Sequence, residues 1–197
     1  MSDMKFWDWF SQNSEEISRS YSDDKLIANI DEKVLLAWPD LAWELGPELS
    51  GGLYFALSPN LNRDLMDKAR HAIHGAPEIP GWRFYATRQL KSWNGQFEII
   101  TSRGLININA FNWQYTLLRY PDGECEILFF GTESDILTEN ERWQAAAIVA
   151  ESLLGEACIL EKGLSFALNS YADIQFSENR KSVLDLPKAI GITAPVY

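Results

Sequence analysis

Residues 76–89 read A-P-E-I-P-G-W-R-F-Y-A-T-R-Q, and this stretch divides the chain by pattern. Two prolines and Gly81 interrupt the helical pattern that precedes them, and a strand pattern begins at Trp82. Helical periodicity dominates before this point, and strand patterns dominate in the region after it. The stretch therefore predicts the corner between a helix and a sheet. It also holds the densest set of aromatic and arginine side chains, the types that anchor interfaces.

Strand alternation separates the side chains of this stretch into two sets. Trp82 and Phe84 are expected to face the core, because aromatic side chains on a half-buried strand usually do. The opposite face carries the candidate binding patch. We expect Arg83 and Tyr85, with Arg88 and Trp93, to form an exposed basic and aromatic surface that binds an acidic peptide or a small anion.

Three helices are predicted before this corner. Apolar residues at spacings of three and four predict a helix over residues 4–21, with Phe6, Phe10 and Ile17 on its buried face. Ser22 or Asp23 then caps a second helix, which ends at Trp38 because Pro39 follows. A third helix runs from an N-cap at Asn62 to a stop at Gly75.

Several strands are predicted, two of them in one clear hairpin. Residues 113–120 and 124–130 flank Pro121-Asp122-Gly123, whose residue types suit a tight turn. Further strands are expected at 41–45, 53–57, 96–102 and 104–109, with a short one at 158–160. Thr138 and Glu141 form a capping box for a helix that ends at Gly155 and buries Trp143 with Ala146, Ala147, Ala150, Leu153 and Leu154. Residues 163–176 fit strand or helix, and the tail is expected to hold one short helical turn.

Strands flanked by helices without strict alternation indicate an α+β fold. The expectation is a single layer of mixed or mainly antiparallel sheet, about six strands wide, with helices packed on it. One domain over residues 1–197 is expected, because a chain of this length buries roughly 70% of its unfolded surface.

Composition narrows the class of partner and the compartment. The formal net charge of −11 argues against nucleic acid or an anionic membrane as partner, since both are polyanions. Cys125 and Cys158 form neither a disulfide framework nor a zinc signature, and the N-terminal residues lack the pattern of a signal peptide. A cytoplasmic protein is therefore expected. Its acidic surface favours solubility and would also attract a basic partner.

No motif points to a cofactor, and none assembles a catalytic constellation. Asp67, His71 and His74 share one side of the third predicted helix, a spacing that suits a metal. They lie opposite its apolar face, so a solvated surface is the favoured interpretation and a metal site the weaker one. Ser165 follows Gly163 but lacks the second glycine of a nucleophile elbow. Carboxylate pairs on predicted strands remain open, because acidic residues are numerous.

Short motifs resemble those of a family of uncharacterised bacterial domains. They are F-W-x-W-F at residues 6–10, L-S-P-N at 57–60, A-P-x-I-x-G-W-x-F at 76–84 and L-L-G-E at 153–156. The resemblance implies a bacterial cytoplasmic domain and transfers no site residue. We expect a non-enzymatic protein-interaction domain, of the immunity or adaptor type. The alternative is a small-ligand binder or hydrolase-like enzyme with a cleft lined by Trp82, Trp93 and strand glutamates.

Overall fold

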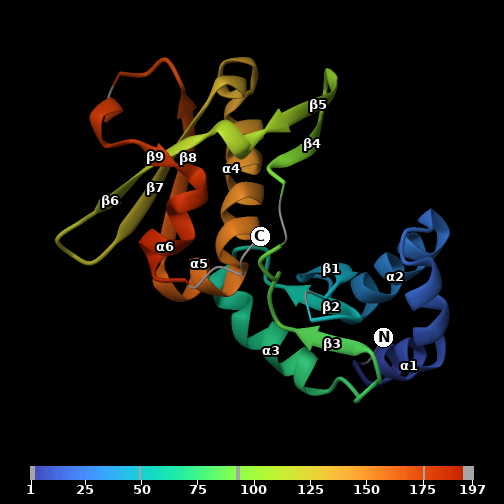
Figure 1. Ribbon diagram of the computed structural model, residues 1–197. Coiled ribbons are helices and arrows are strands. Elements are labelled where there is room, and N and C mark those ends of the chain that lie inside the picture. The colour runs from blue at the N-terminus through green and yellow to red at the C-terminus, as the bar shows by residue number, and fades with distance from the viewer. Residues whose placement is uncertain (1–2, 49, 92–93, 175, 193–197) are drawn as a thin grey trace. The chain divides into compact units, whose positions relative to one another are not determined.

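The computed structural model describes residues 3–48, 50–91, 94–174 and 176–192 (Figure 1). The chain divides into two compact units, residues 1–89 and 90–197. We refer to them as unit 1 and unit 2 and describe each by itself. The expectation of a single domain over residues 1–197 stays a prediction.

Two long helices open unit 1, as their periodicity predicts. Helix α1 spans Asp3–Ser20 and α2 spans Asp24–Ala37. The Asp23 side chain accepts hydrogen bonds from the amides of Lys25 and Leu26, which satisfies donors that the first turn of a helix leaves free. Helix α2 ends at Ala37, and Trp38 leaves the helical conformation because the proline that follows it disfavours helical geometry there.

A three-stranded sheet completes unit 1. Strands β1 (Ala42–Pro47) and β2 (Leu53–Ser58) form an antiparallel hairpin, and β3 (Trp82–Tyr85) pairs in parallel with β2, which gives the order β1-β2-β3. Between β2 and β3 the chain forms a short 3₁₀ turn, Arg63–Leu65, capped by Asn62, and then helix α3, Met66–His74. A parallel pair needs such a crossover connection. The strands predicted at 41–45 and 53–57 and the third predicted helix are confirmed.

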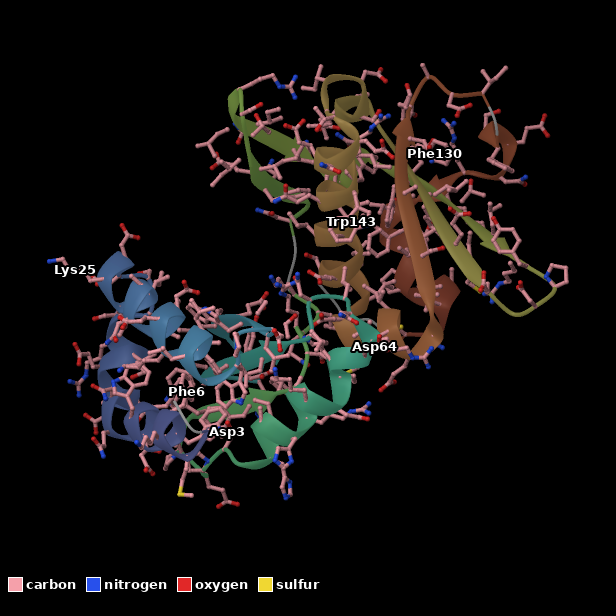
Figure 2. The ribbon with its side chains drawn as sticks, turned by 180° about the vertical axis from the view of Figure 1, so that it is seen from behind. Asp3, Phe6, Lys25, Asp64, Phe130 and Trp143 are labelled. Carbon is pink, nitrogen blue, oxygen red and sulfur yellow. The ribbon has the colours of Figure 1, made fainter. Side chains whose placement is uncertain are left out.

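Aromatic side chains fill the core of unit 1. Phe6, which is labelled in Figure 2, and Phe10 extend from α1 into this cluster, and both are fully buried. Alternation along the strands directs Phe55, Trp82 and Phe84 to the same cluster. The indole of Trp7 donates a hydrogen bond to the Ala72 carbonyl at 3.0 Å and so ties α1 to α3.

Unit 2 holds two sheets. Strands β4 (Gln96–Thr101) and β5 (Gly104–Asn109) pair only with each other among the described residues. The second sheet has the order β8-β7-β6-β9, formed by β6 (Gln114–Arg119), β7 (Cys125–Gly131), β8 (Leu164–Ser170) and β9 (Lys181–Ser182). The hairpin between β6 and β7 closes as predicted, with Gly123 at φ +91°.

Among its described residues, unit 2 has three α-helices: α4 (Glu139–Leu154), α5 (Glu156–Lys162) and α6 (Leu186–Ile190). The capping box of Thr138 and Glu141 is present at the start of α4. The prediction that Trp143 is buried is wrong: its side chain is 53% exposed and contacts Phe166 instead (Figure 2). In the described chain, no single helix is long and apolar enough to cross a membrane. Among the same residues, only α4 and α5 taken together have the required length and composition, and a bend of 99° separates them.

The structure also bears on two further expectations, the short strand at 158–160 and the open assignment of 163–176. Residues 158–160 lie in α5 and not in a strand, because the chain resumes helical geometry directly after the break at Gly155. Residues 164–170, which fitted either structure, form strand β8.

The α+β class is confirmed, but the expectation of one sheet of about six strands is wrong. The described residues form nine strands in three small sheets. Alternation identifies a strand and one buried face, yet it carries no information on which strands pair. Each hairpin closes locally, whereas the parallel pairs β2/β3 and β7/β8 and the short antiparallel pair β6/β9 join distant segments.

Candidate functional site

Strand β3 borders two features of unit 1, and together they form the candidate site. One is the polar face of the sheet, where the side chains opposite the aromatic core emerge. The other is an apolar groove between β3, the 76–80 loop and α3. Of the predicted patch, Arg83 is exposed, whereas Tyr85 and Arg88 are partly buried. Trp93 lies outside the described residues.

Two tyrosine–glutamate pairs occupy the polar face. The Tyr85 hydroxyl donates to a carboxylate oxygen of Glu48 at 2.8 Å, and the Tyr54 hydroxyl donates to Glu44. The two rings meet edge to face, with centroids 6.0 Å apart. Burial and the adjacent carboxylates raise the pKa of both tyrosines. Both phenols are therefore firmly protonated donors, and neither can serve as a base near neutral pH.

Arg88 contacts a turn at the carboxyl end of β2. Its guanidinium donates to the Asn60 side-chain oxygen at 3.2 Å, and the Asn60 amide donates to Ser58 Oγ at 2.9 Å. Asn60 and Leu61 both have positive φ, 53° and 61°, which is costly for a leucine. Arg88 therefore has a structural role in holding this turn. Whether the predicted patch also binds a partner stays a prediction.

The apolar groove has a volume of about 550 Å³. It is lined by residues of three segments in sequence, the end of α3, the loop and β3: Ile73, Ala76, Pro77, Glu78, Ile79, Pro80, Trp82 and Phe84. Trp82 is only partly buried, since it packs against Phe10 at 4.9 Å between ring centroids and also lines the groove. Glu78 supplies the one charge among the lining side chains.

A tight turn fixes the shape of this groove. The Trp82 amide donates to the Ile79 carbonyl at 3.1 Å, with Pro80 second in the turn and Gly81 third at φ +81°. Proline and a glycine of positive φ at these places are typical of a type II turn. The dipeptide Pro80-Gly81 carried this signal in the sequence. What the sequence did not indicate is that Ile73, on α3, lies on the other side of the groove.

The weaker chemical candidates occupy solvent-exposed positions. Helix α3 exposes all three residues of the metal candidate, Asp67, His71 and His74, as expected for a solvated face. The Asp67 Oδ1 atom lies 3.4 Å from Arg70 Nη1. Within the described ranges, no group of three His, Cys, Asp or Glu side chains is arranged to hold a metal ion. Cys125 and Cys158 are free thiols, and burial raises the pKa of Cys158.

Comparison with known proteins finds no matching family model, no matching curated protein and no matching solved structure. The resemblance to an uncharacterised bacterial domain family therefore stays a hypothesis. Any functional assignment has to come from the groove and the polar face themselves.

Proposed function

We propose that unit 1 is a protein-binding module that takes an apolar side chain of a partner into the groove beside β3. One observation carries this proposal: Trp82 lies half-buried in a groove whose other lining side chains are almost all apolar. Tryptophan is among the residue types enriched at the energetic centres of protein interfaces, where a partner completes its burial. Its ring is held in place by Phe10 and Phe84, so binding would cost little side-chain entropy.

The negative charge of the groove and of the chain indicates which class of partner to expect. Glu78 is the charged side chain of the groove, and the whole chain carries a formal net charge of −11. A carboxylate beside an apolar pocket favours a partner with a basic residue next to its apolar anchor, and the acidic surface would speed its approach. An immunity-type or adaptor role in a bacterial cytoplasm suits such a module.

A small-ligand binder is the second candidate, because the volume of the groove lies in the range of small-molecule sites. Trp82 and Glu78 supply one aromatic surface and one carboxylate. Acid–base catalysis of the hydrolase type generally uses two positioned groups, so binding is the more economical interpretation of these side chains.

Photo-crosslinking in the native host tests the proposal. p-Benzoylphenylalanine replaces Glu78, at the rim of the groove, or Leu35, an exposed position on α2 that serves as the matched control. We expect a protein adduct of defined mass from position 78 that is absent from position 35 and is lost when unlabelled protein competes. The same adducts from both positions, or none from position 78, would contradict the proposal.

A further inference from the structure

A second groove lies in unit 2, along the outer edge of β6. It has a volume of about 560 Å³ and is bordered by β6, by the chain leading into β9 and by α6. Its apolar lining includes Leu117, Leu118 and Phe176, and its polar lining includes Arg119, Asn179 and Lys181.

The groove exists because β9 is short. β9 pairs with β6 only through Gln114 and Tyr115. On its N-terminal side the chain forms a 3₁₀ turn, Ser177–Asn179, which begins after Phe176 at φ +62° and does not continue the ladder. The strand edge beyond Tyr115 is therefore not covered by β9.

The hydrogen-bonding pattern identifies the main-chain groups of β6 that the short strand β9 leaves uncovered. The Val183 amide donates to the Trp113 carbonyl at 3.0 Å, so odd-numbered residues of β6 direct their main-chain groups toward the β9 side. Leu117 and Arg119 follow the same alternation. Within the described chain, no hydrogen bond reaches the outward amides and carbonyls of these two residues.

The side chains of the groove favour an anionic ligand. Arg119 donates to the Ala189 carbonyl at 3.3 Å, and neither Arg119 nor Lys181 forms an ion pair within the described ranges. This is notable in a chain with 28 acidic and 17 basic residues. Among the described residues, the hydroxyl of Tyr115 has no hydrogen-bond partner, although Tyr115 is only 2% exposed and lies on the same strand face as Leu117 and Arg119.

We propose that this groove binds an extended peptide segment that carries a carboxylate side chain. The peptide adds as a short strand to the edge of β6, and its main chain bonds with Leu117 and Arg119. Its carboxylate lies between Arg119 and Lys181, and an apolar side chain packs on Leu117 and Phe176. Glu178 and Asp185 lie on neighbouring exposed segments, so one acidic residue is favoured over a run of them.

A phage-displayed library of random heptapeptides, selected on the full chain, tests the inference. We expect the recovered peptides to contain one Asp or Glu beside apolar β-branched residues. The tightest of them should shift the amide resonances of Leu117 and Arg119 in the NMR spectrum. Blocking its bonding amides by N-methylation should remove those shifts.

Two variants separate this site from general electrostatics. R119Q with K181Q should weaken binding of that peptide by roughly tenfold or more, because hydrogen bonds to charged groups are lost. The control K25Q removes an exposed charge on α2 and should leave binding unchanged. No selected peptides, no acidic preference, or equal binding by the double variant would each overturn the inference.

Discussion

The two units use the same connectivity with crossover helices of different length. In unit 1, hairpin β1–β2 is followed by α3 and by β3, which pairs in parallel with β2. In unit 2, hairpin β6–β7 is followed by α4 and α5 and by β8, which pairs in parallel with β7. Aromatic rings supply the largest buried side chains in both units, Phe6, Phe10 and Phe55 in unit 1 and Trp113, Phe129 and Phe130 in unit 2. The comparison shows that this topology accepts crossovers of different length, the 9-residue helix α3 in unit 1 and the 16-residue α4 with the 7-residue α5 in unit 2.

A second shared device is an aromatic ring lying over a sheet glycine. In unit 1 the Tyr54 ring covers Gly46, and its hydroxyl donates to Glu44. In unit 2 the Trp113 indole covers Gly131 and donates to Glu133 at 2.9 Å. In both units the missing side chain provides room for the ring, and a glutamate accepts from its polar group.

The largest predicted effect concerns the aromatic core. Phe10→Ala should lower the free energy of unfolding of unit 1 by about 3–5 kcal/mol, because Phe10 is fully buried and contacts six other aromatic rings. Hydrogen exchange of the amides in α1 and β2 measures the loss. Tyr21→Ala, which removes an exposed aromatic ring of the same unit, is the control. Equal losses from the two variants would show that the ring cluster does not carry the stability of unit 1.

The glycine comparison predicts a difference between the units. A Cβ at Gly131 would lie 2.4 Å from the Trp113 indole, whereas one at Gly46 would lie 3.3 Å from the Tyr54 ring. Gly131→Ala should therefore lower the free energy of unfolding by about 1–3 kcal/mol, and Gly46→Ala should lower it by less than about 1 kcal/mol. Urea unfolding of both variants measures the costs. The reverse ranking would mean that the indole moves more freely than the phenol.

Helix caps provide a smaller comparison. Thr138→Ala should lower the free energy of unfolding by about 1 kcal/mol, because the Thr138 and Glu141 side chains accept hydrogen bonds from each other's main-chain amides at the start of α4. Asn62→Ala should cost about 0.5 kcal/mol, because Asn62 accepts a single bond, from the Asp64 amide. Thermal unfolding distinguishes the two, and an equal loss would contradict the reciprocal role of Glu141.

The smallest predicted change in stability comes from the ionisation of Tyr54, which takes place only at alkaline pH. Burial and the adjacent Glu44 raise the pKa of Tyr54 above its ordinary 10.0. Its contribution to stability is thus complete below pH 10 and is lost as the pH rises beyond that value. Unfolding measured from pH 8 to 11 should show a steeper loss for the natural chain than for Tyr54→Phe. Parallel curves would show that Tyr54 does not titrate differently in the folded state.

Local features, including the hairpin between β6 and β7, were predictable from the sequence, and the pairing of distant strands was not. The caps at Asp23 and Thr138 and the turn at Pro121-Asp122-Gly123 act within a few residues, so their patterns identify them directly. The parallel pairing of Phe55 with Phe84 depends on how α3 returns the chain, which alternation does not encode. For the same reason Trp82 was assigned to the core, whereas it both contacts the core and lines a groove completed by Ile73.

The measurement closest to the central claim is the affinity of the protein crosslinked at position 78 for the purified chain. Trp82→Leu keeps an apolar side chain toward Phe10 and removes the indole from the groove, and Glu78→Lys reverses its charge. Calorimetric titration should give dissociation constants weaker by about tenfold or more for each variant, with folding verified by circular dichroism. Affinities equal to that of the natural chain would contradict the assignment of the groove as the binding site.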